Sequence, residues 1–477
     1  MHFIEINSLP DNLLLEIFYF YWKNQGLYVY GYHSLSTWDW HRLTQVCSKW
    51  RRIIFSSPRR LGLQLLCTYG TPVNRNLGYW PPLPLIIDHS TSRDVNACKN
   101  LTPSDEDNIV TALEASNRVR YVGIPVTNSL LAKETRKPFP GLTHISLSSN
   151  DENVLTMPDG FLDRSAPALQ VAHFQGIPLL TFPTLLSSAR DLVDLRLLNI
   201  PPEGCIQPEA TASNLAALTG LRTLLIGFKS PTRSRKTRYQ HHICRTCLPS
   251  LTTFGFYGVA EYLEDLVALI DAPQLGYFRI SYFNQLDFQV RVPRLSNFIG
   301  RAQNLYLARF KRAQIDFGLN GVYIILYYDD GKGLLDKNHF SLQISCQGLD
   351  WQVSHVAQTL SQTCAMISNV EDLAIETRDS DMLSDGNDFM DNNQWLELLR
   401  LFTAVKTLHV SEKLAVYVAR GLEGVTETTV DEIMPALRSL FLEGTPLTSV
   451  GRFVAVRQLS GLSVTVLDAP AEFIERF

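Results

Sequence analysis

The chain has 477 residues, which is enough for two or three ordinary domains or for one extended array of repeats. Hydrophobic residues make up 45% of it and charged residues 19%, a composition that excludes a wholly disordered chain. Its 43 lysines and arginines against 47 aspartates and glutamates give a net charge of −4. No overall basic field is present to hold a phosphate backbone, so we expect no nucleic-acid partner.

The lengths of the apolar runs and the distribution of the cysteines indicate the cellular compartment of the chain. The apolar runs are short, with Val322–Tyr328 typical, and fall well below the roughly 18 residues that a membrane-spanning helix needs. Met1–Asn7 has no cationic start, long apolar stretch or cleavage site of a secretion signal. The eight cysteines are scattered along the chain and form no disulfide framework. These features predict a chain with reduced thiols in the cytoplasm or nucleus and without a membrane partner.

The first sixty residues predict three short helices. Leu9-Pro10-Asp11 precedes an apolar run with helical spacing, Leu13–Phe18; the proline suits a first turn and the aspartate suits the positive end of the helix dipole. A second helical pattern covers Trp40–Cys47. A third begins near Ser48, the predicted N-cap, and ends before Pro58.

These helices carry more apolar surface than so small a unit can hide. Either the surplus packs on the rest of this chain, or it is a docking face for a separate protein. Composition alone leaves both interpretations open.

The residues of this module resemble a known family. Leu9-Pro10-x-x-x-Leu14-x-x-Ile17-Phe18, followed by Arg42-Leu43-x-x-Val46-Cys47-Ser48-Lys49-Trp50-Arg51, is similar to the F-box, especially in the F-box proteins of mushroom-forming (basidiomycete) fungi. The resemblance implies a three-helix module over residues 5–60 that docks on a Skp-type adaptor, and through it on a cullin. On the matching positions, the implied adaptor-binding residues are Leu9, Pro10, Leu14, Ile17, Leu43, Val46, Trp50 and Ile53.

One departure from the family lies in residues 23–38, which look inserted between the first and second helices. Gly26, Gly31 and Ser34 are residues typical of a loop, and three tyrosines lie among them. Such a loop could obstruct or reshape the adaptor-binding surface.

After residue 60 the sequence alternates short apolar strands with helical stretches. The strand signal is Leu-x-x-Leu-x-Leu, in which alternate apolar residues face the core, and most successive motifs begin about 23 to 30 residues apart. Its nine occurrences are Leu142–Leu147, Leu169–Phe174, Leu192–Leu197, Leu221–Ile226, Leu251–Phe256, Leu275–Ile280, Val370–Ile375, Val405–Val410 and Leu437–Leu442. Helical patterns cover Asp105–Asn117, Ala260–Ile270, Val353–Ile367, Asn393–Phe402 and Thr428–Met434.

This repetition predicts an α/β fold (α+β overall) in which a degenerate leucine-rich-repeat solenoid with a mainly parallel sheet follows the three helices. Residues 61–140 form its leading segment, with a proline-led strand over Pro81–Asp88, and residues 141–477 form the repeats. A β-rich interruption is expected near residues 292–347, with strands over Phe317–Tyr328 and Phe340–Cys346 around a turn at Asp329–Gly333. The alternative is an ordinary α/β domain with chance matches to the motif.

No catalytic motif is present: the sequence has no Walker loop, no His-Glu-x-x-His and no Gly-x-Ser-x-Gly elbow. His241-His242-x-Cys244-x-x-Cys247 has metal-like spacing, but two adjacent histidines suit one zinc ion poorly, so we expect no metal and no cofactor. Two charged stretches stand out in the repeat region. Lys229–Arg238 is basic, and it is either a solvated loop or a segment that attracts acidic or phosphorylated parts of a target. Glu376–Asp391 is an acidic loop without the spacing of a calcium site.

The expected function is that of a non-enzymatic, substrate-recognition adaptor in an SCF-type (Skp–cullin–F-box) ubiquitin ligase, which recruits an unknown protein target through its repeats. The alternative is a leucine-rich interaction scaffold with a vestigial F-box and no cullin partner. A third possibility, an enzyme of unrecognised type, requires a pocket with converging ionisable residues.

Overall fold

The structure is a computed structural model. It describes residues 6–25, 28–29, 32–33, 39–69, 73–89, 101–127, 130, 137–149, 161–164, 166–178, 182–231, 245–283, 292–307, 310–328, 339–378, 392–443 and 450–467. The chain divides into two compact units, Met1–Leu192 and Val193–Phe477, which we describe separately.

The first unit begins with helices. A short 3-10 helix, η1 (Ile6–Ser8), leads into α1 (Asp11–Gln25), and α2 (Asp39–Val46) and α3 (Ser48–Ser56) follow. In the segment between α1 and α2, the two-residue strands β1 (Tyr28–Val29) and β2 (Tyr32–His33) pair in antiparallel orientation. The three helices therefore lie over the stretches of the sequence that have helical patterns.

The rest of the first unit is a parallel sheet whose strands follow one another in chain order. Helices or 3-10 turns connect several of them: α4 (Val73–Tyr79), α5 (Pro103–Glu114), η2 (Phe161–Arg164) and α7 (Phe182–Ser188). The strands are β3 (Leu65–Cys67), β4 (Leu85–Asp88), β5 (Val119–Pro125), β6 (His144–Ser148) and β7 (Val171–Gln175).

The second unit continues the same construction. Its sheet has the order β8-β9-β11-β13-β16-β15-β14-β17-β18-β19-β20, and β10 pairs with β12 beside it. The strands are β8 (Asp194–Ile200), β9 (Thr223–Phe228), β10 (Thr246–Cys247), β11 (Thr253–Gly258), β12 (Ile270–Asp271), β13 (Tyr277–Tyr282), β14 (Arg312–Gly318), β15 (Gly321–Tyr327), β16 (His339–Ile344), β17 (Asp372–Thr377), β18 (Thr407–Val410), β19 (Ser439–Leu442) and β20 (Thr465–Leu467).

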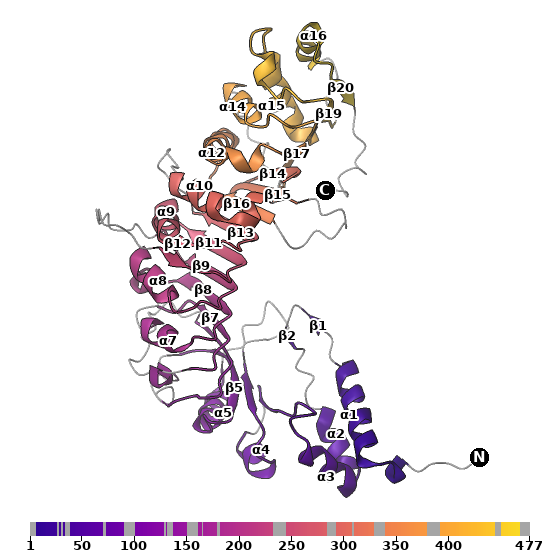
Figure 1. The fold of residues 1–477 in the computed structure, drawn as a ribbon, viewed down its shortest axis with the longest axis vertical. Helices are drawn as coiled ribbons and strands as arrows, with labels where there is room; N and C mark the ends of the chain where they lie inside the picture. Colours follow the sequence, from indigo (N-terminus) through magenta and orange to yellow (C-terminus); the bar gives the residue numbers. More distant parts are fainter. Residues whose placement is uncertain are drawn as a thin grey trace, which may run out of the picture. The chain divides into compact units, whose positions relative to one another are not determined.

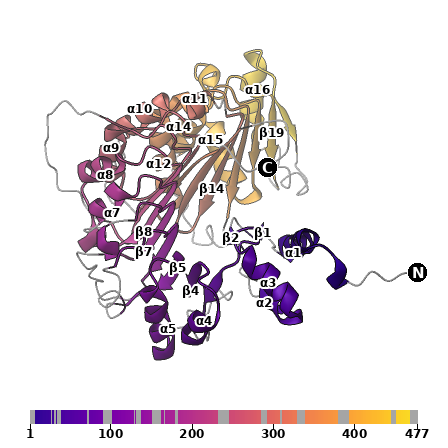
Figure 2. The same ribbon diagram turned by 60° about the horizontal axis from the view of Figure 1, so that its bottom comes forward.

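The described helices of this unit line one face of the second sheet, and none of them covers the other face, which we call the open face (Figure 1, Figure 2). They are η3 (Pro202–Gly204), α8 (Pro208–Leu215), α9 (Ala260–Leu269), α10 (Pro293–Arg301), α11 (Gln303–Leu307), α12 (Leu349–Gln362), α13 (Cys364–Ile367), α14 (Asn392–Arg400), α15 (Glu412–Glu423), η4 (Val430–Glu432) and α16 (Gly451–Leu459). The sheet side chains that face the helices are buried, whereas their alternate neighbours are mostly partly exposed, as in β8 and β18.

All nine Leu-x-x-Leu-x-Leu motifs coincide with strands, and each strand begins two residues after the motif does. The first apolar residue of each motif is buried just ahead of its strand, as Leu142, Leu251 and Val405 illustrate. In the sheet the second position stacks on its neighbours, so that Leu195, Leu224 and Phe254 are in register on successive strands. The predicted α/β fold with a mainly parallel sheet is therefore confirmed.

The regular order reverses once. After β13 the chain passes through α10 and α11 and then forms β14, which pairs in parallel with the later strand β17. β15 is antiparallel to both β14 and β16, and β16 pairs in parallel with β13. The single strand predicted over Phe317–Tyr328 is wrong, because a turn at Leu319-Asn320 divides it into β14 and β15. The predicted turn at 329–333 lies outside the described residues.

Two helix predictions need correction. The helix expected over Thr428–Met434 is only the 3-10 turn η4. Val353–Ile367 is two helices rather than one, because α12 ends at Gln362 and α13 follows.

Candidate functional site

The three helices α1 to α3 share a small core. Leu14 is fully covered, Ile53 is buried, and the ring of Phe18 lies 4.7 Å from that of Trp50. Lys49 on α3 donates to the carbonyl of Leu9 at 3.1 Å, which holds the start of α1 against α3. The covered stripe of α1 therefore stabilises the module itself.

The start of α3 shows that the predicted N-cap, Ser48, is wrong. The N-cap of α3 is Cys47, whose Sγ accepts a hydrogen bond from the backbone N–H of Trp50 at 3.5 Å, and Ser48 is the first helical residue. Arg51 also donates from Nε to the carbonyl of Thr44 at 3.0 Å. The thiol occupies the position that a hydroxyl commonly takes.

A second apolar stripe of α1 lies in solvent. Leu13, Ile17 and Phe20 are 51%, 42% and 57% exposed. Their spacing of four and three residues aligns them along one side of the helix, about 100° around the axis from Leu14 and Phe18. We call Leu13, Ile17 and Phe20 the α1 stripe. On α2, Val46 is also 57% exposed.

The eight predicted adaptor-binding residues thus divide into three groups. Pro10, Ile17 and Val46 are exposed; Leu9 and Leu43 are half-buried; Leu14, Trp50 and Ile53 are buried in the core of the three helices. Leu13 and Phe20 are exposed neighbours that the motif positions did not include. Their spacing from Ile17 was visible in the sequence, but it does not reveal which of two adjacent stripes faces the core.

An aromatic cluster joins the module to the start of the first sheet. Trp40 is buried, its Nε1 donates to the carbonyl of Gln64 at 3.2 Å, and its ring lies 5.3 Å from that of Trp80. His41 stacks on Trp80 at 4.6 Å with the ring planes 21° apart, and burial lowers its pKa to about 4. A neutral imidazole therefore fills this contact at physiological pH.

A buried Cys–His pair tests the possibility of an enzyme. Cys67 Sγ lies 3.7 Å from His89 Nε2, near the carboxylate of Asp105. Burial raises the pKa of Cys67 to about 12, and Asp105 adds to the shift; burial also lowers the pKa of His89. Both groups are therefore held neutral, which is the opposite of the thiolate–imidazolium pair that a cysteine nucleophile needs.

The residues with metal-like spacing are described only in part. His241, His242 and Cys244 lie outside the described residues, and Cys247 is exposed. In the described part of the chain, no group of three or more His, Cys, Asp or Glu side chains could hold a metal ion. Most of the basic stretch, from residue 232, and most of the predicted acidic loop, from residue 379, also lie outside it. The start predicted for that loop is wrong, because Glu376 and Thr377 belong to β17.

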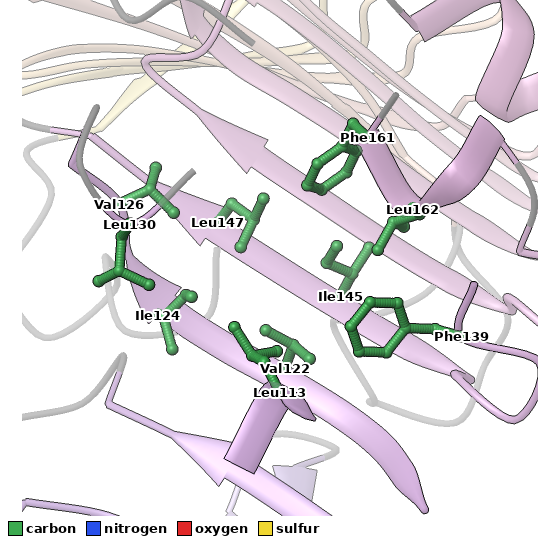
Figure 3. A pocket seen from close by; sticks show the side chains of 10 residues that line it. All are labelled: Leu113, Val122, Ile124, Val126, Leu130, Phe139, Ile145, Leu147, Phe161 and Leu162. Atoms are coloured by element: carbon green, nitrogen blue, oxygen red, sulfur yellow. The ribbon is translucent and has the colours of Figure 1, made fainter. Parts of the chain in front are cut away.

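A small cavity in the first unit is entirely apolar. It measures about 20 Å³ and lies between the helix-facing side of β5 and β6 and residues such as Leu113, Phe139 and Phe161 (Figure 3). A void of this size has room for about one water but offers no polar partner to it. It is a packing defect of the core.

Over the described residues, no helix is long and apolar enough to cross a membrane.

A comparison with known families agrees with the geometry of the three helices. Residues 6–60 match the F-box-like family model. The chain begins with an F-box-like domain. No curated protein matches the chain. Among solved structures, the chain is similar to the leucine-rich repeat-containing protein LegL7 from Legionella pneumophila at 10% sequence identity and a TM-score of 0.25, over 72% of this chain and 99% of that one.

Proposed function

We propose that this chain is the substrate-recognition subunit of a Skp–cullin–F-box ubiquitin ligase, acting in the cytoplasm or nucleus. The observation that carries the proposal is the exposed α1 stripe within an F-box-like domain. F-box domains generally bind Skp-type adaptors. Aligned apolar side chains in water are typical of a protein-binding surface, and a partner that covers them gains their transfer free energy.

The chain's contribution to ubiquitin transfer is proximity. A target held on the repeats brings its lysines close to the ubiquitin-conjugating enzyme, and the effective concentration of the two reactants rises. The thioester chemistry belongs to other subunits, so this chain needs no catalytic residue, metal or cofactor. The aromatic cluster around Trp40 and Trp80 supports this function, because it fixes the F-box-like domain to the first strands.

The test compares charge insertion on the α1 stripe with the same change elsewhere. Ile17→Asp combined with Phe20→Asp places two carboxylates in the proposed interface, and burying them costs about 3 kcal/mol or more. Binding of a purified Skp-type adaptor, measured by isothermal titration calorimetry, is expected to weaken by about 100-fold or more. Val416→Asp on α15 is the control, since Val416 is 43% exposed and Ile17 is 42% exposed.

The proposal fails if the double variant binds the adaptor as tightly as the wild-type chain does. Circular dichroism of each variant shows whether the helices persist, so loss of binding through unfolding is recognised. The Val416→Asp chain is expected to bind like the wild type.

The second candidate is an interaction scaffold with a vestigial F-box and no cullin partner. The burial of Leu14, Trp50 and Ile53 in their own module favours it, because these predicted contacts are unavailable to an adaptor. Much of the inserted segment that could cover the docking face lies outside the described residues. Co-purification of a cullin with the full-length chain supports the ligase subunit, whereas an adaptor-free chain that still binds targets supports the scaffold.

A further inference from the structure

The open face of the second sheet carries a network of polar side chains where its strand order reverses. Gln343 Nε2 donates to the Tyr323 hydroxyl at 2.7 Å, and the Ser281 hydroxyl donates to Gln343 Oε1 at 3.0 Å. The Tyr327 hydroxyl donates to Gln314 Oε1 at 3.1 Å. These side chains come from β13, β16, β15 and β14, so the network spans neighbouring strands.

Carboxylates gather at the far side of this network. Asp316 on β14 and Glu376 on β17 are directly in register on adjacent parallel strands and face the same side. Gln314 Nε2 links them, at 2.8 Å from Asp316 Oδ1 and 3.1 Å from Glu376 Oε2. Arg378 pairs with Asp316 through Nε at 2.9 Å and Nη2 at 2.8 Å.

Arg378 is held in place by more than its ion pair. Its guanidinium lies 3.8 Å from the centre of the Tyr323 ring, a cation–π contact. Both Nε and Nη2 of Arg378 bond to Asp316, so the guanidinium mainly compensates the charge of Asp316. Asp316 itself is buried although it lies on the open face.

Glu376 has no such compensation. It is half-buried, and among the described residues it accepts from the Gln314 amide and has no basic group within ion-pair distance. Burial, and then the charges of Asp316 and Glu443, raise its pKa, whereas Gln314 and Arg378 lower it by less. An ionised Glu376 therefore destabilises the free chain, and a cation placed beside it would relieve that cost.

We propose that this face, defined by Asp316, Tyr323, Tyr327, Glu376 and Arg378, binds a basic segment of the target protein, with an arginine or lysine side chain beside Glu376. Charge complementarity carries the choice of occupant, because the carboxylates of Asp316, Asp372, Glu376 and Glu443 outnumber the guanidiniums of Arg312 and Arg378 on or beside these strands. The tyrosine rings add a surface on which a guanidinium or an alkylammonium group is attracted. An acidic or phosphorylated segment would meet repulsion from Glu376.

The assignment deepens the proposed function, since it names the chemistry of the target that the ligase subunit would hold. It concerns only the second unit, however, and does not depend on adaptor binding. A chain that fails to bind an adaptor but binds basic peptides would therefore overturn the ligase assignment and leave this one in place.

The test uses the full-length chain and three short fluorescein-labelled peptides in which glycine alternates with arginine, serine or glutamate. Fluorescence anisotropy is expected to show binding of the arginine peptide and weak or no binding of the other two. Glu376→Gln removes one charge with little change of shape and is expected to weaken binding of the arginine peptide about fivefold to tenfold. Glu423→Gln, at the exposed end of α15, makes the same charge change away from this face and is expected to have no effect.

Because the charge of Glu376 destabilises the free chain, Glu376→Gln is expected to unfold at the same temperature as the wild type or higher, which separates lost binding from lost folding. Equal weakening by Glu376→Gln and Glu423→Gln would mean a general charge effect and would overturn the proposal. Preferential binding of the glutamate peptide would overturn it as well.

Discussion

Leu13 and Leu14 are adjacent leucines with opposite surroundings, and they give the sharpest test of how the F-box-like domain divides its apolar residues. Leu14 is fully covered, whereas Leu13 is 51% exposed. Leu14→Ala removes buried methyl groups from a small core and is expected to lower the free energy of unfolding by about 2–5 kcal/mol. Leu13→Ala leaves that core intact and is expected to lower it by only about 0.5 kcal/mol.

Adaptor binding, in contrast to stability, should depend directly on Leu13. About half of the Leu13 side chain remains for a partner to cover, which is worth about 1 kcal/mol, so Leu13→Ala should weaken adaptor binding about fivefold. Urea denaturation followed by tryptophan fluorescence measures the first effect, since Trp50 lies in the affected core, and calorimetric titration with a Skp-type adaptor measures the second. Equal loss of stability in the two variants, or unchanged adaptor binding by a folded Leu13→Ala chain, would refute the reasoning.

Three further predictions concern the stability of the two units. Arg457 on α16 is fully buried and donates to the carbonyls of Ile433, Met434, Pro435 and Leu437 at 3.1–3.3 Å. Arg457→Met should therefore lower the free energy of unfolding, measured by urea denaturation, by about 3–5 kcal/mol. Arg452→Met, at an exposed position of the same helix, should lower it little, and equal losses would contradict this account. Burial lowers the pKa of His41 to about 4, so only the unfolded chain takes up a proton there as pH falls below about 6.5. The chain should therefore lose stability between pH 7 and pH 5, and His41→Phe should lose less, as urea midpoints at the two pH values will show. Gly300 lies within α10 with open space around the position of a Cβ, so Gly300→Ala should raise the free energy of unfolding by about 0.5–1 kcal/mol, and a lower thermal midpoint would count against it.

The sequence predicted the strands of the repeats well because their signal is local. A buried apolar residue two positions ahead of each strand and alternate apolar residues within it mark the helix-facing side, and nothing distant is needed to recognise them. The three N-terminal helices were recognisable for the same reason. The division of β14 from β15 was also within reach, since Asn320-Gly321 marks a turn between two apolar runs, although the two-residue loop itself is Leu319-Asn320.

The contacts that complete the degenerate repeats could not be predicted. The asparagine that usually follows a strand in leucine-rich repeats is mostly missing. Helix side chains distant in sequence bond some backbone groups instead. Gln352 on α12 donates to the carbonyls of Gly318 and Cys346 at 2.7 and 2.9 Å. Glu264 on α9 accepts from the backbone N–H groups of Arg294 and Leu295 at the start of α10. Such pairings depend on which repeats become neighbours.

The candidate docking site was predictable only in part. The motif located the domain, but helical spacing alone does not distinguish the covered stripe with Leu14 and Phe18 from the exposed one with Leu13 and Phe20. That choice follows from where α2 and α3 pack. The network around Glu376 was hidden for a similar reason, because β14 and β17 are adjacent only after the strand order reverses.

Site-specific photo-crosslinking tests the central claim, that the α1 stripe contacts a Skp-type adaptor, most directly. The full-length chain with Phe20→p-benzoylphenylalanine is mixed with the purified adaptor and irradiated, beside a chain with the same replacement at Val416. We expect a covalent product with the adaptor from position 20 and none from position 416. No product from position 20, or equal products from both positions, would contradict the account.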